Sequence, residues 1–186
     1  RGPVSPFYIK PDLVAPGAFI NTTDTDGNYK ISSGTSFAAP HVAGTAALIL
    51  QKNPELTPQE VKSILMTTTD MVYDQFNDRF PIDVSGNGRV NASNAISADL
   101  IIMPPNLIFD LSSANQIQTK DLEIRGIDDQ SASVRFEENY AADFDYSLDG
   151  NNMTINAKLT QQNLGYFESR IIISHNEIDY HIPIIV

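Results

Sequence analysis

The pattern of apolar residues in this 186-residue sequence changes once, between Ser97 and Pro105. Before this stretch the apolar residues recur at helical spacing, and after it they alternate in short segments bounded by turn residues. Met103-Pro104-Pro105-Asn106 marks the change, because proline interrupts helices and central strands. The sequence therefore predicts two domains: residues 1–98, which contain helices, and residues 99–186, which are all β.

The second domain has the pattern of a β-sandwich. Hairpin turns are predicted at Asp149-Gly150-Asn151-Asn152 and at His175-Asn176-Glu177. Seven short strands joined in this way are typical of an immunoglobulin-like or fibronectin type III-like sandwich. The seven predicted strands are residues 107–111, 120–125, 131–137, 143–148, 153–159, 170–174 and 178–185.

The last of these strands contains Pro183, which predicts an edge position, because proline cannot donate to a central ladder. An exposed edge is a possible docking site for a partner. We interpret His175 and His181 as ordinary surface or edge residues.

The first domain contains a long apolar run that begins near Ser36 and ends at about Gln51. Its start reads Gly-Thr-Ser-Phe-Ala-Ala-Pro-His-Val-Ala-Gly over residues 34–44. Because this run is apolar on every side, it predicts a helix buried at the centre of the domain. The first N–H groups of a helix lack partners and its dipole is positive there, so this position suits a nucleophile that forms an oxyanion. A simple N-cap is the alternative for Ser36.

Residues 34–44 resemble the serine-containing motif of the subtilisin-like serine proteases (subtilases, peptidase family S8). Arg1-Gly2-Pro3 and residues 9–17 resemble the family's segment that leads towards the serine, and residues 86–96 resemble its terminal turn and short helix. The resemblance implies that residues 1–98 are the C-terminal part of a parallel-sheet α/β peptidase domain. It also implies that Ser36 is the nucleophile, that its N–H donates to the oxyanion, and that Thr35 and Gly34 support it.

In this family the acid and the base of the triad, and the asparagine of the oxyanion hole, lie well upstream of the serine. The resemblance therefore implies an endopeptidase that forms an acyl-enzyme on Ser36 only when an N-terminal portion of the protease supplies those groups. That portion is either upstream in the same chain or a separate cleaved chain. We expect the present chain alone to be inactive, and the substrates to be proteins or peptides. His41 corresponds to a structural histidine of the family, not to the base.

Residues 57–65 predict a second helix whose start is well specified. Thr57 is the expected N-cap, Pro58 the first helical residue, and Glu60 the partner that closes a capping box. Val61, Ile64 and Leu65 form its apolar stripe.

Composition narrows the possible partners and location. The chain has no cysteine, so it has neither disulfides nor thiolate metal sites. Its 23 acidic and 12 basic residues give a net charge of −11, which argues against nucleic acid and anionic membranes as partners. No apolar run is long enough to span a membrane. Together with the resemblance, this leads us to expect a secreted or cell-surface extracellular protein.

Two acidic turns have features of calcium-binding loops. Residues 24–28 begin like an EF-hand loop, but no glutamate follows at the required spacing, so an Asp-Gly hairpin turn is the better interpretation. Residues 83–88 are interpreted as a turn in the same way. We expect no metal or other cofactor in this chain. The family resemblance makes calcium possible only in the missing part of the catalytic domain.

A second hypothesis stays open at this point. The chain could belong to a non-catalytic surface-layer or filament scaffold protein derived from a subtilase. The apolar final strand, residues 180–186, is the feature that would support it, through strand exchange between subunits.

Overall fold

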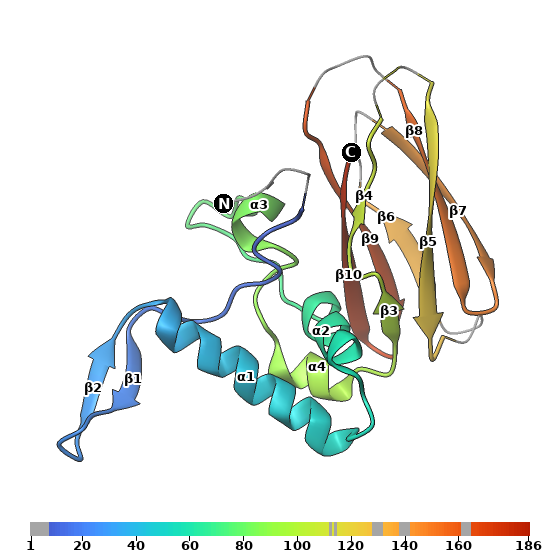
Figure 1. Cartoon of the computed structure of the whole chain (residues 1–186). Helices are drawn as coiled ribbons and strands as arrows, with labels where there is room; N and C mark the ends of the chain where they lie inside the picture. The colour runs from blue at the N-terminus through green and yellow to red at the C-terminus, as the bar shows by residue number, and fades with distance from the viewer. Residues whose placement is uncertain (1–7, 112, 114, 128–131, 138–141, 161–164) are drawn as a thin grey trace.

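The computed structural model describes residues 8–111, 113, 115–127, 132–137, 142–160 and 165–186. Arg1-Gly2-Pro3 and the first residue of the strand predicted at 131–137 lie outside the described residues. The chain forms a helical part with a projecting hairpin, followed by two packed sheets, and the two parts lie against each other (Figure 1).

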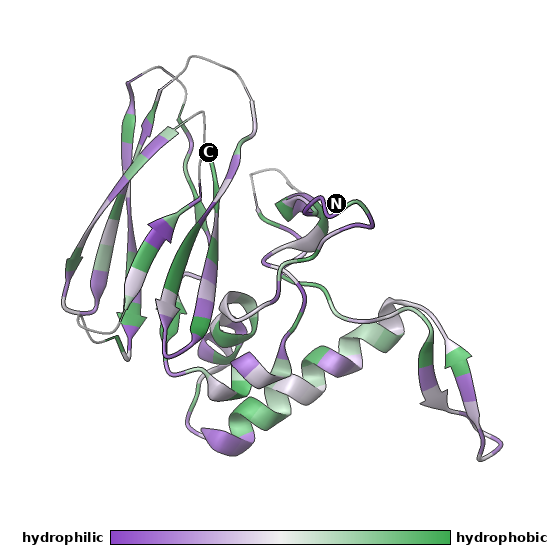
Figure 2. Cartoon of the chain, turned by 180° about the vertical axis from the view of Figure 1, so that it is seen from behind, coloured by the Kyte–Doolittle hydropathy of each residue, from purple (hydrophilic) through white to green (hydrophobic). Residues whose placement is uncertain are grey.

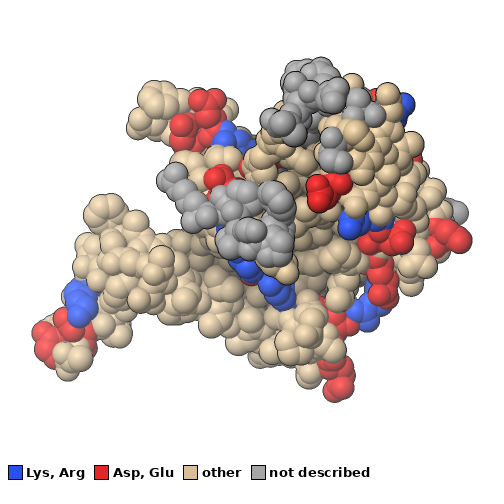
Figure 3. Space-filling model, turned by 45° about the horizontal axis from the view of Figure 1, so that its top comes forward, with Lys and Arg blue, Asp and Glu red and all other residues tan. Residues whose placement is uncertain are grey.

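The helical part contains one hairpin and four helices. They are β1 (Ile20–Thr23), β2 (Tyr29–Ser32), α1 (Thr35–Lys52), α2 (Pro58–Thr67), α3 (Ile82–Ser85) and α4 (Ala92–Ser97). β1 and β2 are antiparallel, so the predicted hairpin turn at residues 24–28 is confirmed. Lys30 pairs with Asp24 at 2.9 Å near this turn, and Figure 3 shows basic and acidic side chains close together at the end of the hairpin.

The predicted start of the second helix is also confirmed. The Thr57 hydroxyl accepts a hydrogen bond from the N–H of Glu60, and the Glu60 carboxylate accepts one from the N–H of Thr57. A small core joins α2 to α1 and α4 through Ile49, Ile64 and Ala95. Residues 83–85, in contrast, form the short helix α3 before Gly86 and not an open turn.

Most of α1 is uncovered in this chain. Thr45 and Ile49 are its buried residues, Leu48 and Leu50 are 45% and 39% exposed, and Figure 2 shows that apolar residues recur along the helix. The prediction that this helix is buried on every side is therefore wrong for the chain as described, because α2 and α4 pack along one side of it. Residues 8–98 contain the hairpin and one isolated parallel bridge, Val14 to Arg89, so a parallel sheet stays a prediction for the assembled domain.

Residues 101–185 form two four-stranded sheets that face each other (Figure 1). One has the strand order β4-β10-β9-β6 and the other β3-β5-β8-β7. The strands are β3 (Ile101–Met103), β4 (Leu107–Ile108), β5 (Ile117–Arg125), β6 (Ser133–Phe136), β7 (Ala142–Asp149), β8 (Asn152–Leu159), β9 (Glu168–His175) and β10 (Ile178–Ile185). The predicted sandwich is present, with β3 as a strand that the sequence analysis missed.

Apolar side chains from both sheets form the sandwich core. Those with no exposed surface include Leu122, Ile124, Met153, Ile155, Ile171, Ile173, Ile182 and Ile184. The hairpin of β9 and β10 turns at Asn176 and Glu177, whose φ angles of 47° and 65° suit a two-residue hairpin turn. Both predicted hairpin turns are confirmed by the pairing of the strands that they join.

The position predicted for the last strand is wrong. β10 lies between β4 and β9, so it is not an edge strand, although β4 pairs only with Ile184 and Ile185. His175 and His181 are 5% and 9% exposed, so their interpretation as surface residues is also wrong. The reason is that the sheet containing β10 is covered on both faces: by the sandwich core on one, and by the helical part on the other.

The helical part contacts that outer face through residues near α3. Ile82 packs with Ile9 and Ile185. The N–H of Ile82 donates to both carboxylate oxygens of Glu168, at 2.9 and 2.8 Å. Arg170, 1% exposed, reaches the carbonyl oxygen of Gly86. The apolar final strand is thus buried within its own chain, which removes the feature that would have supported strand exchange.

Candidate active site

Ser36 is the second residue of α1, on an exposed turn that begins at Gly34. Its N–H has no acceptor within the helix, because the first N–H groups of a helix have none. No acidic residue lies in the first turn and no side chain caps it, so the positive end of this 18-residue helix is not neutralised. The turn offers an exposed hydroxyl beside an unpaired donor in a positive field, which is what stabilisation of an oxyanion requires.

Gly34 gives this turn its shape. It has φ 156° and ψ 161°, a combination that is essentially confined to glycine. Its carbonyl accepts the N–H of Phe37 at 3.0 Å, and its own N–H donates to the carbonyl of Gly17 at 2.7 Å. A Cβ on Gly17 would lie 2.8 Å from the Gly34 oxygen and 3.1 Å from the Cβ of Ala38. The turn therefore fits closely against residue 17.

The structure places all three predicted site residues, Gly34, Thr35 and Ser36, on this one turn. Gly17, which lies outside the serine motif, packs against this turn as well. The signal available was a glycine after Pro16, which marks a turn but does not reveal what packs against it.

His41 is engaged elsewhere. Its Nδ1 lies 2.8 Å from the carbonyl oxygen of Phe37, so Nδ1 carries the proton and donates it to the helix backbone. The carbonyl of His41 in turn accepts the hydroxyl of Thr45 at 2.8 Å. Within the described residues no side chain hydrogen bonds to the Ser36 hydroxyl. A general base for Ser36 is thus not found in the part of the chain that the structure describes.

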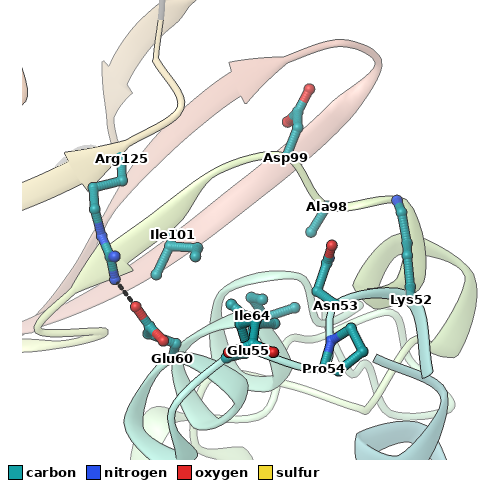
Figure 4. A pocket seen from close by; sticks show the side chains of 11 residues that line it. Lys52, Asn53, Pro54, Glu55, Glu60, Ile64, Ala98, Asp99, Ile101 and Arg125 are labelled. Carbon is teal, nitrogen blue, oxygen red and sulfur yellow. Dashed lines mark hydrogen bonds and ion pairs between the residues drawn. The ribbon is translucent and has the colours of Figure 1, made fainter. Parts of the chain in front are cut away.

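A hollow of about 630 Å³ lies at the other end of α1, between α2 and the first strand of the sandwich (Figure 4). Arg125 pairs there with Glu60, and Lys52 donates to a backbone carbonyl of α4. Asp99 accepts hydrogen bonds from side chains of β9 and β10. The contacts of Glu60 and Asp99 join the helical part to the sandwich, and that of Lys52 joins α1 to α4. Ser36 does not line the hollow, so the two are separate places in the fold.

The described residues include no group of three or more His, Asp or Glu side chains close enough to hold a metal ion. They also include no helix that is long and apolar enough to cross a membrane.

Comparison with known proteins identifies several relatives of this chain. Over 111 residues the chain is 38% identical to the minor extracellular protease Vpr of Bacillus subtilis, covering 56% of this chain and 14% of that protein. It is 40% identical over 110 residues to the serine protease AprX of Bacillus subtilis, and this alignment covers 52% of this chain and 24% of that protein. It is 34% identical over 142 residues to the subtilisin-like protease SBT1.6 of Arabidopsis thaliana, and this alignment covers 63% of this chain and 17% of that protein. The chain thus spans less than a quarter of the length of each of these relatives.

Among solved structures, the M1 domain from titin aligns with 43% of this chain and 82% of its own length, at a TM-score of 0.31 and 10% identity. A similarity at that level does not establish a shared fold. Residues 1–98, more than half of the sequence, match the model of the peptidase S8 family, the subtilases. The chain therefore belongs to the subtilase family.

Proposed function

We propose that the chain is the nucleophile-bearing part of a subtilisin-type serine endopeptidase, with Ser36 as the attacking residue. The observation that carries this proposal is the position of Ser36, exposed at the unneutralised N-terminus of α1 within the family match. Its hydroxyl attacks the scissile carbonyl of a protein or peptide and forms an acyl-enzyme, which water then hydrolyses. The N–H of Ser36 donates to the oxyanion, and Thr35 and Gly34 shape the turn.

The remaining groups come from an N-terminal portion of the protease. A serine hydroxyl needs a base within hydrogen-bond reach, and the described residues provide none at Ser36. The uncovered apolar surface supports the same view, because Phe19, Tyr29 and Ile31 are 83%, 72% and 70% exposed. That portion supplies the acid, the base and the oxyanion asparagine and covers these side chains, so residues 1–186 alone are inactive.

An extracellular location, secreted or at the cell surface, is part of the proposal. It is supported by the relative that is named as an extracellular protease. Nothing in the structure favours the scaffold alternative, because the final strand that would exchange between subunits is buried within the chain.

The test is labelling of the full-length protein with a fluorophosphonate probe, followed by peptide mapping. We expect the adduct on Ser36, none in the Ser36→Ala variant, and none on residues 1–186 expressed alone. The control is His41→Gln, which should still label, because the His41 ring is bonded to the helix backbone. Loss of labelling in a folded His41→Gln protein would make His41 the base, and absence of labelling in the full-length wild type would overturn the protease proposal.

A further inference from the structure

Residues 12–17 form an extended segment, here called the strut, that connects two distant parts of the fold. At one end the N–H of Val14 donates to the carbonyl of Gly88 at 2.9 Å, and the carbonyl of Val14 accepts the N–H of Val90 at 2.8 Å. At the other end Gly17 accepts the N–H of Gly34, directly before the turn that carries Ser36. The strut is thus held by backbone hydrogen bonds at both ends.

The fit between the strut and residues 86–90 leaves no space. Gly86 has φ 59°, and a Cβ there would lie 2.3 Å from the carbonyl oxygen of Pro11 and 2.6 Å from that of Asp12. The next residue, Asn87, donates its N–H to the same Asp12 carbonyl at 3.0 Å. A movement of residues 86–88 is therefore transmitted to the strut.

The side chain of Asn87 joins this arrangement to the sandwich. It is 0% exposed, and its Nδ2 donates to the carbonyl oxygens of Pro105 and His181, at 3.2 and 3.3 Å. Pro105 lies between β3 and β4, and His181 lies in β10. Asn87 is thus bonded to two strand regions of the sandwich through its side chain and to the strut through its backbone.

We propose that Asn87 is a positioning residue of the protease: it fixes the sandwich to the strut, and the strut fixes the turn of Ser36. This inference rests on the proposed function. Asn87 itself touches no substrate. Removal of its amide leaves the buried carbonyl of His181 and the half-buried carbonyl of Pro105 without this donor and frees residues 86–88 to shift. Small displacements of a nucleophile reduce reaction rates strongly.

The matched control is Ser63. It is also 0% exposed, and its hydroxyl donates to the carbonyl of Ile102 in β3, so it too joins the helical part to the sandwich. Ser63 lies in α2, however, and has no bond to the strut. Asn87→Ala and Ser63→Ala each remove one buried side-chain donor to a sandwich carbonyl, and of the two residues only Asn87 bonds directly to the strut.

The experiment uses the full-length protein and two measurements. The first is amide hydrogen exchange at Val14, Gly34 and Val90, which reports on the strut whether or not the protein is a protease. The second is the rate of labelling by a fluorophosphonate small enough to report on the nucleophile and not on substrate binding. Should Asn87→Ala fail to accumulate as a folded protein, Asn87→Ser, which keeps a shorter donor, takes its place.

We expect Asn87→Ala to speed exchange at these three amides and to slow labelling about tenfold, and Ser63→Ala to change neither by more than about twofold. Equal effects of the two variants, or unchanged exchange in Asn87→Ala, would overturn the inference. If exchange responds as expected and wild type does not label, the strut is established as a structural connection but the positioning role fails together with the proposed function.

Discussion

Gly34 donates its backbone N–H to the carbonyl oxygen of Gly17, at 2.7 Å, directly before α1 begins. The two glycines come from different segments, and each is restricted for its own reason: a Cβ on Gly17 would lie 2.8 Å from the Gly34 oxygen, whereas Gly34 has space but a φ of 156° that other residues rarely adopt. The geometry of the nucleophile turn therefore depends on a residue outside the serine motif.

Gly17→Ala should slow fluorophosphonate labelling of Ser36 by about tenfold or more. The new Cβ would lie 2.8 Å from the Gly34 oxygen and 3.1 Å from the Cβ of Ala38, so the turn must move. The measurement is the labelling rate of the full-length protein, together with its melting temperature. Ala18→Ser, a change of similar size at the exposed neighbouring position, is the control and should label normally. Normal labelling of Gly17→Ala would show that the turn tolerates the displacement.

Tyr180→Phe should destabilise the protein by about 1–3 kcal/mol. The Tyr180 hydroxyl accepts the N–H groups of Asp99 and Leu100, at 3.0 and 3.2 Å, and donates to the Asp99 carboxylate at 2.8 Å. The ring is 0% exposed, so removal of the hydroxyl leaves partners at the domain junction unpaired. Urea unfolding measures the change in the free energy of unfolding. The control is Tyr146→Phe, because Tyr146 is 43% exposed, and its free energy of unfolding should lie within about 0.5 kcal/mol of the wild-type value. Equal effects would mean that the junction gains nothing from the Tyr180 hydroxyl.

Local features of the fold could be predicted from the sequence. Thr57, Pro58 and Glu60 specify the start of α2, and Asn176-Glu177 specifies a hairpin turn, because the residues responsible are adjacent in the chain. The position of Ser36 at the start of a helix could be predicted for the same reason, because the motif and the helix are contiguous.

What depends on packing between distant segments could not be predicted. The burial of His181 could not be predicted, because nothing in the sequence shows that residues 79–88 cover the outer face of its sheet. Likewise, the contact of Gly17 with Gly34 and the bonds of Asn87 to the sandwich join segments with no shared pattern.

Glu60→Gln should remove a pH-dependent part of the stability at acid pH. The N–H of Thr57, then the Arg125 guanidinium and the Thr57 hydroxyl, lower the pKa of Glu60 from 4.5 to about 2. A carboxyl with a lowered pKa in the folded state stabilises it above its unfolded pKa, and this contribution is lost as the pH falls from 4.5 towards 2. Melting temperatures across this window, in the Ser36→Ala background to avoid autolysis, should fall less steeply for Glu60→Gln. Parallel curves would show that another carboxylate is responsible.

His181→Leu should remove a different part of the pH dependence, at higher pH. Burial, and then the nearby Arg170 guanidinium, lower the pKa of His181 from 6.5 to about 4. Between these two values the unfolded chain binds a proton that the folded protein does not, so stability is lost as the pH falls from 6.5 to 4, by up to about 3 kcal/mol. Asn87 bonds to the backbone of His181 and not to its ring, so the substitution keeps that contact.

The measurement for His181 is the free energy of unfolding in urea at intervals between pH 7 and pH 4, again in the Ser36→Ala background. His181→Leu should give a flatter dependence than wild type over this window, whatever its absolute stability. Glu60→Gln is the matched control, because its own effect begins only near pH 4.5, so above that pH its slope should equal that of wild type. A slope that His181→Leu leaves unchanged would mean that the ring takes up its proton in the folded protein, and that the interface between the sandwich and residues 79–88 opens to water before it unfolds.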